Sequence, residues 1–168
     1  DQTRLPGEEI YIEMRTKEDV YEAIYKLRVR GAPAIGVAAA YGLFVAVRDI
    51  PETADMAMFR ETLHGAKEYL AGARPTAVNL AWALNRMYDL YESERPNSVK
   101  DAKELLFAEA EAIRREDEAA CYAMGEYGLS LLEPGMGILT HCNAGTIATA
   151  KYGTCLAPIY LGTESGYE

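Results

Sequence analysis

Residues 98–129 read SVKDAKELLFAEAEAIRREDEAACYAMGEYGL, and this stretch decides the fold of the first part of the chain. Ser98 followed three residues later by Asp101 is a signal for the start of a helix. Apolar or small side chains then recur every seven residues, which predicts a seam that packs on another helix: Val99, Leu106, Ile113, Ala120 and Tyr127. The segment therefore predicts the longest helix of the chain, ended by Glu133-Pro134-Gly135.

Upstream of this helix the sequence predicts further helices and at most one short strand. Thr16 with Asp19 resembles a capping box, and Pro33 can serve as the first residue of a helix rich in alanine and glycine that allows a neighbour to approach closely. Pro51 with Thr53 marks another helix start, and a further helix is expected from about Thr76. The alternating residues 10–14 could form a short strand.

Downstream of the long helix the pattern changes. Residues 137–142 form a short apolar run, followed by a turn at 143–146 and a second alanine-rich run. This order predicts a buried strand, a tight turn and a helix start. We therefore expect a mainly α-helical domain over residues 1–134, followed over 135–168 by the first strand-turn-helix of a Rossmann-like α/β domain. A single strand lacks partners for its backbone groups, so the chain looks truncated.

Composition limits the classes of partner. The formal net charge of −9 argues against a nucleic-acid partner, because phosphate backbones are bound through basic patches. The longest apolar stretch, residues 32–47, is shorter than the ~20 residues that span a bilayer, so no membrane partner is expected. Three irregularly spaced cysteines fit neither a disulfide framework nor a zinc motif, and reduced thiols in a cytoplasmic protein are the simplest interpretation.

Two short segments each place an arginine just before a helix that a proline initiates. They are Arg30-Gly31-Ala32-Pro33-Ala34-Ile35-Gly36 and Arg74-Pro75-Thr76-Ala77-Val78-Asn79. Helix amides together with a guanidinium suit a phosphate group, and a doubly charged phosphate favours two cations. The alternative for each segment is a simple turn between helices with a solvated arginine.

A third segment, Thr140-His141-Cys142-Asn143-Ala144-Gly145, places a cysteine at the carboxyl end of the predicted strand. Ligands of α/β folds bind at that end. The alternative is a buried cysteine that packs as a small hydrophobic residue, which we expect of Cys121 and Cys155. A Cys-His pair with His141 is disfavoured, because adjacent side chains on a strand point to opposite faces.

At these three segments the sequence closely resembles the methylthioribose-1-phosphate isomerases. The runs RGAPAIG, RPTAVNL and GILTHCNAG occur in that order, and Asp1–Gly7 and Lys151–Thr154 look similar too. The resemblance covers nearly the whole chain. It implies conversion of 5-methylthioribose 1-phosphate to 5-methylthioribulose 1-phosphate, an aldose–ketose isomerisation in methionine salvage.

The resemblance also implies residue roles. Cys142 would be catalytic, and the substrate, a phosphorylated pentose, would be bound by Arg30, Gly31, Ala32 and Arg74. It implies no metal and no organic cofactor, and it implies a homodimer. The catalytic aspartate of such enzymes follows well after the cysteine motif, whereas this chain ends at Glu168. We therefore expect the 168-residue polypeptide to be inactive alone.

Three alternatives share the same superfamily and stay open at this point. Two are isomerases, acting on ribose 1,5-bisphosphate or on 5-deoxyribose 1-phosphate, and the sequence does not identify a pocket for the C5 substituent. The third is a non-catalytic regulatory subunit like those of the eukaryotic translation-initiation exchange factor. The presence of Cys142, Arg30 and Arg74 favours an enzyme.

Overall fold

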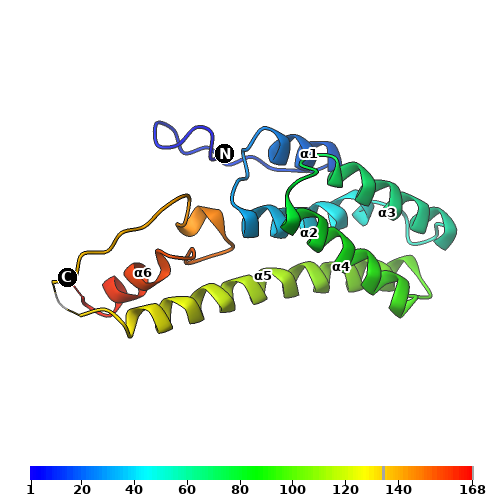
Figure 1. Cartoon of the computed structure of the whole chain (residues 1–168). Coiled ribbons are helices and arrows are strands. Elements are labelled where there is room, and N and C mark those ends of the chain that lie inside the picture. Colours follow the sequence, from blue (N-terminus) through cyan, green and yellow to red (C-terminus); the bar gives the residue numbers. More distant parts are fainter. Residues whose placement is uncertain (134, 168) are drawn as a thin grey trace.

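The computed structural model describes residues 1–133 and 135–167, and these residues form helices joined by loops (Figure 1). In chain order the helices are α1 (Lys17–Tyr25), α2 (Ala32–Arg48), α3 (Met56–Ala71), α4 (Val78–Glu94), α5 (Val99–Leu129), the 3-10 turn η1 (Thr146–Ala148) and α6 (Ala157–Glu164). Within the described residues, no helix is long and apolar enough to cross a membrane.

The helix starts predicted at Thr16 and Ser98 are confirmed, whereas the start predicted at Pro51 with Thr53 was too early, because α3 begins at Met56 with Asp55 as its N-cap. The Thr16 side chain accepts from the backbone N–H of Asp19, and the Asp19 carboxylate accepts from the backbone N–H of Thr16, which completes the capping box of α1. Ser98 caps α5 by accepting from the N–H of Asp101. A side-chain cap stabilises a helix by about 1 kcal/mol, so these residues fix where the two helices begin.

The hydrophobic core lies between the first five helices, with α2 at its centre. Its buried side chains run from Val20 on α1 to Ile113 in the first half of α5. Small residues on α2 allow close packing, as the sequence predicted. A Cβ added at Gly36 would lie 3.1 Å from the carbonyl oxygen of Asn79, and one added at Gly42 would lie 2.6 Å from Cγ1 of Val20. Two neighbouring helices thus press directly on the α2 backbone.

The second half of α5 leaves this core and carries α6 beside it (Figure 1). A Cβ added at Gly125 would lie 2.5 Å from Cδ1 of Leu161, so the two helices approach closely here. The sevenfold seam predicted for α5 is correct only in its first half. Ala120 is exposed and Tyr127 is 77 % exposed, whereas Cys121 and Gly125 are buried. A helix of 3.6 residues per turn drifts by ~20° per heptad, and the buried face drifts with it.

The predicted strand over residues 137–142 is wrong for the described chain. Residues 136–141 form no strand and are exposed, and Cys142 follows with a positive φ of 71°. Residues 10–14 likewise form no strand. The reason is physical: a strand is held by hydrogen bonds to a neighbouring strand, and neither segment has one here. Instead of a strand-turn-helix, the segment after Cys142 continues into η1 and α6.

The predicted end of the long helix was also too late. Helix α5 ends at Leu129, and its C-cap Ser130 stands three residues before Glu133. Pro134 and Glu168 lie outside the described residues. The boundary proposed at residue 134 therefore falls in the loop between α5 and η1. Among the described residues, the core of the first five helices ends at Ile113, and the division into two domains stays a prediction.

Two glycines in helix interiors should respond oppositely to alanine. We expect Gly42→Ala to destabilise the chain by about 1–2 kcal/mol, because the new methyl group would collide with the stiff side chain of Val20. Gly65→Ala, with nothing within 4 Å, should stabilise it by about 0.5–1 kcal/mol through helix propensity. Urea unfolding followed by circular dichroism measures both. Equal shifts of the midpoint would contradict the close packing of α2.

Candidate functional site

The Arg30 segment forms the turn that begins α2. Gly31 is the N-cap with a φ of 109°, a conformation that L side chains rarely adopt, and it offers no side chain to cap the helix. Pro33 stands in the first turn. The helix amides at this end are therefore left to other acceptors, and the positive end of the helix dipole favours an anion.

The Arg74 segment begins α4 in the same manner. Ala77 is the N-cap and makes no side-chain hydrogen bond. In contrast, α1, α3 and α5 are each capped by a polar side chain, from Thr16, Asp55 and Ser98 respectively. Among the first five helices, α2 and α4 are thus the two whose starts have no side-chain cap. The anion-binding role of both segments stays a prediction.

The two arginines are also without acidic partners in the part of the chain that the structure describes. Arg30 is exposed and Arg74 is half-buried, and neither takes part in an ion pair there. Other arginines are held by carboxylates, such as Arg60 by Glu92 at 2.6 Å. In a chain of net charge −9, guanidinium groups without a carboxylate are the cations best able to bind an anionic ligand.

The beginnings of α2 and α4 meet around one cavity. Gly36 and Asn79 are in contact, and both line a cavity of about 410 Å³ with residues from α2, α4 and α5: Pro33, Val37, Val78, Trp82, Ile113, Glu116 and Asp117. Its walls are mostly apolar, and its charged lining groups are carboxylates. Neither Arg30 nor Arg74 lines it, so the cavity is distinct from the predicted phosphate contacts.

The Arg30 turn packs against the loop that follows Cys142. A Cβ added at Gly31 would lie 2.5 Å from Cα and from the carbonyl oxygen of Ala148, so the two backbones are in direct contact. Only glycine fits such an approach. Residues 31 and 148, far apart in the sequence, are thereby joined. The structure brings the first predicted segment against η1, which begins directly after the third predicted segment.

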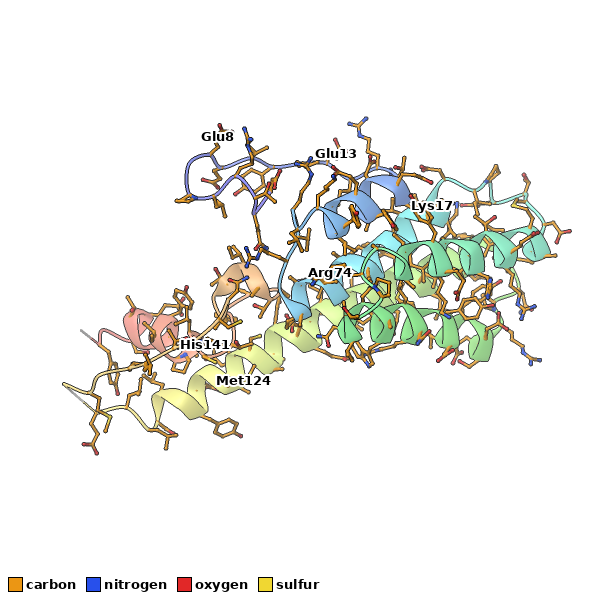
Figure 2. All side chains as sticks on the ribbon, turned by 45° about the horizontal axis from the view of Figure 1, so that its top comes forward. Glu8, Glu13, Lys17, Arg74, Met124 and His141 are labelled. Carbon is orange, nitrogen blue, oxygen red and sulfur yellow. The ribbon has the colours of Figure 1, made fainter. Side chains whose placement is uncertain are left out.

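Cys142 lies on the loop between α5 and η1. Its side chain is exposed. Figure 2 shows its neighbour His141 in the part of the molecule that carries α6 and the second half of α5, and Arg74 among the helices of the core. The catalytic role predicted for Cys142 is neither supported nor contradicted by a contact among the described residues. What the structure does show is an accessible thiol on the loop that leads to η1.

The other two cysteines differ from one another. Cys121 is buried, as predicted, and burial together with the nearby Asp117 carboxylate raises the pKa of its thiol. Cys155 was predicted to be buried and is exposed. The error has a simple cause: Cys155 precedes the short helix α6 instead of continuing an apolar run within one element.

Asp117 was not identified as a site residue by the sequence analysis. It lines the cavity, and its carboxylate accepts from the backbone N–H of Ala150 at 2.6 Å. Burial raises the pKa of Asp117, while the Ala150 hydrogen bond lowers it and the Glu118 charge raises it. A signal existed in the sequence, because Asp117 lies four residues after buried Ile113 and four before buried Cys121. An acid on the apolar face of a helix commonly has a specific partner.

We expect substitutions of Asp117 to separate its hydrogen bond from its charge. Asp117→Ala removes the acceptor for Ala150 and should cost about 1–3 kcal/mol. Asp117→Asn keeps an acceptor and removes the buried charge, so at neutral pH it should be more stable than Asp117→Ala.

The pH dependence supplies a second check on Asp117. A raised pKa means that the folded state binds the proton more tightly than the unfolded state. Its contribution to stability therefore falls as pH rises from about 3.8 through the raised value and is constant above that. Asp117→Asn should lose this part of the pH dependence in urea unfolding from pH 3 to 7. An unchanged profile would contradict the assignment.

Comparison with known proteins adds an independent finding. Residues 28–158 match the model of the initiation factor 2 subunit family. The chain is 60 % identical over 167 residues to the methylthioribose-1-phosphate isomerase of Parabacteroides distasonis and 53 % identical over 167 residues to the 5-deoxyribose 1-phosphate isomerase of Petrotoga mobilis. These matches cover 99 % of the chain, and 50 % and 48 % of the two relatives. The chain spans about half the length of the curated relatives it matches.

Two solved structures of similar proteins share the fold of this chain. The delta subunit of the translation initiation factor eIF-2B from A. fulgidus superposes with a TM-score of 0.91 at 44 % identity, covering 100 % of this chain and 48 % of that one. The 5-methylthioribose 1-phosphate isomerase from Pyrococcus horikoshii has a TM-score of 0.91 at 40 % identity, with 98 % and 46 % covered. The resemblance found in the three motifs is thus confirmed over the whole chain, which belongs to the initiation factor 2 subunit family.

Proposed function

We propose that this chain is the substrate-binding part of an aldose–ketose isomerase that converts 5-methylthioribose 1-phosphate to 5-methylthioribulose 1-phosphate. The observation that carries the proposal is the pair of uncapped helix starts, α2 and α4, each preceded by an arginine without an acidic partner among the described residues. Identities of 60 % and 58 % to two methylthioribose-1-phosphate isomerases support this substrate.

The proposed chemistry divides between two parts of the site. Arg30, the turn at Gly31 and Ala32, and Arg74 bind the phosphate of the substrate. Because phosphate blocks the anomeric oxygen, an acid must assist cleavage of the ring C–O bond before hydrogen moves from C2 to C1. Cys142 acts as a base or stabilises charge in that step. The acid is contributed by residues outside these 168, since the relatives are about twice as long.

The relatives' additional length also bears on the role of residues 135–168. We propose that residues 135–168 begin a Rossmann-like domain and that the segment 137–141 pairs with a strand outside this sequence. Its exposure supports this, because Leu139 is 98 % exposed and Ile138 is 50 % exposed. We further propose that the protein is cytoplasmic, because the exposed free thiols of Cys142 and Cys155 suit a reducing compartment. We also propose that it forms a homodimer.

A second candidate substrate is 5-deoxyribose 1-phosphate, favoured by the 53 % identity to the Petrotoga mobilis relative. Both substrates carry an uncharged group at C5. We propose that this group enters the cavity beside Pro33, whose lining includes the carboxylates of Glu116 and Asp117. Glu116 is paired with Arg86, but the carboxylate of Asp117, which has no ion pair among the described residues, would disfavour a second phosphate, so ribose 1,5-bisphosphate is the poorer candidate.

The activity is tested with this chain alone and with a chimera that appends the second half of the Parabacteroides distasonis relative. We expect the chimera, and not the chain alone, to convert 5-methylthioribose 1-phosphate, followed by ³¹P NMR. A parallel series with 5-deoxyribose 1-phosphate and ribose 1,5-bisphosphate changes only the C5 substituent. Turnover of neither 5-methylthioribose 1-phosphate nor 5-deoxyribose 1-phosphate by the chimera would refute the proposal.

The chemical role of Cys142 is tested in the same assay. Cys142→Ala in the chimera should lower kcat by about 10²-fold or more. Cys155→Ala, which removes the other exposed thiol, serves as its control.

Arg74→Ala tests the proposed phosphate contact. If Arg74 makes a charged hydrogen bond to the phosphate, its loss should weaken substrate binding by roughly 1.5–3 kcal/mol. The matched control is Arg115→Ala, an exposed arginine on α5 whose guanidinium donates only to the carbonyl of Glu111 among the described residues. Calorimetric titration of the chimera with substrate measures both. If both variants bind the substrate with equal affinity, Arg74 does not contact the phosphate and its segment is only a structural turn.

A further inference from the structure

The side chain of Gln2 connects the two loops that form the proposed site. Its Nε2 donates to the carbonyl oxygen of Arg30 at 3.2 Å and to that of Ile147 at 2.6 Å. Arg30 precedes the Gly31 turn, and Ile147 lies in η1 on the loop after Cys142. One amide group from the amino-terminal arm therefore bridges backbones that are 117 positions apart, at the place where Gly31 touches Ala148.

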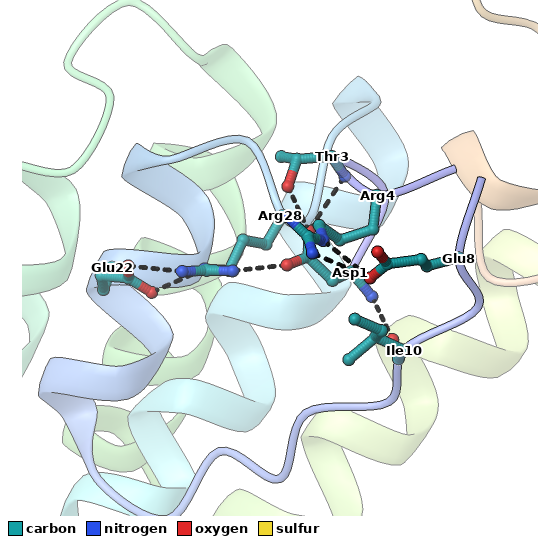
Figure 3. A network of polar contacts seen from close by, with 7 residues as sticks. All are labelled: Asp1, Thr3, Arg4, Glu8, Ile10, Glu22 and Arg28. Atoms are coloured by element: carbon teal, nitrogen blue, oxygen red, sulfur yellow. Dashed lines mark hydrogen bonds and ion pairs between the residues drawn. The ribbon is translucent and has the colours of Figure 1, made fainter. Parts of the chain in front are cut away.

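The arm that carries Gln2 is itself firmly attached. The Asp1 carboxylate is almost fully buried, pairs with Arg28, and accepts from the N–H and the hydroxyl of Thr3 (Figure 3). Arg28 also pairs with Glu22 of α1 at 2.9 Å. Between these contacts the backbone N–H of Gln2 donates to the carbonyl of Arg28. The backbone at Gln2 is thus held by its own hydrogen bond to Arg28 and by the contacts of Asp1 next to it.

The orientation of the Gln2 amide is fixed by its partners. Both are carbonyl oxygens, which accept only, so the NH₂ group must face them and Oε1 must point away. Oε1 is buried and has no hydrogen-bond partner within the described structure. An unsatisfied buried acceptor costs free energy that offsets the gain from the two donated bonds. Stability alone is therefore a poor explanation for this residue.

We propose that Gln2 is a positioning residue that holds the Arg30–Ala32 turn against η1 and so fixes the phosphate-binding turn relative to the loop of Cys142. The proposal rests on the proposed isomerase function. Its physical basis is that catalysis depends on geometry, since a displacement of ~1 Å can cost ~10²-fold in rate. A second anchor of the same loop, from Asp117 to the N–H of Ala150, comes from α5. On the side of α2, the Gln2 bridge adds hydrogen bonds to the backbone contact between Gly31 and Ala148.

The bridge is tested first in the 168-residue chain by amide hydrogen exchange. Gln2→Ala should raise exchange in peptides covering 29–35 and 144–150 and leave the core of α3 and α4 unchanged. Gln2→Glu, nearly the same shape, should do the same at neutral pH, because a carboxylate cannot donate to two carbonyl oxygens. The control is Arg4→Gln on the same arm, whose ion pair with Glu8 is half exposed. Unchanged exchange in both Gln2 variants would overturn the proposal.

The positioning role is tested by kinetics in the active chimera. Gln2→Ala and Gln2→Glu should lower kcat at least about tenfold with a smaller change in KM, whereas Arg4→Gln should change neither. Faster exchange without loss of kcat would make Gln2 a structural tie only and would overturn the proposal. An inactive unsubstituted chimera would instead refute the isomerase function, and the exchange experiment would still decide whether the bridge exists.

Discussion

The contact between the backbones of Gly31 and Ala148 is the constraint on which the arrangement of the site depends. Because Gly31 has no Cβ and a φ of 109°, the turn before α2 can lie directly against η1. Any side chain at this position would separate the two loops. The helical core and the loop after Cys142 then share one surface, although the core itself ends at Ile113. The amide of Gln2 and the carboxylate of Asp117 hold the same loop from two other directions.

The starts of α2 and α4 have no side-chain cap among the described residues. A polar N-cap would stabilise α4 by about 1 kcal/mol and α2, which already has glycine there, by only about a few tenths of a kcal/mol, and this chain uses polar caps on α1, α3 and α5. At α2 the cap position is Gly31, which the Ala148 contact requires, and at α4 it is Ala77. Leaving amides and a nearby arginine without an internal partner is unfavourable for folding alone. It is favourable for a protein that binds an anion at those positions.

The sequence predicts the helices of this fold well because their signals are local. The capping residues Thr16 and Ser98 need only the chain a few residues away, and both predictions are confirmed. The strand at 137–142 was wrong because strand formation depends on a partner that is distant or absent. The α5 seam was half wrong because a sevenfold repeat does not follow a helix of 3.6 residues per turn over four heptads. The roles of Gln2 and Asp117 depend on contacts between distant segments, which no local pattern reveals.

The exposed segment before Cys142 explains why the three predicted site segments meet only in part. Leu139 is 98 % exposed and Met136 is 52 % exposed, so the segment buries little apolar surface in this arrangement. A partner strand would supply hydrogen bonds to its backbone and cover for its side chains. The loop's other end is already fixed, because Gly31, Gln2 and Asp117 hold residues 147–150. Pairing at 137–141 would therefore change the position of Cys142, while the Arg30–Ala32 turn keeps its contact with η1.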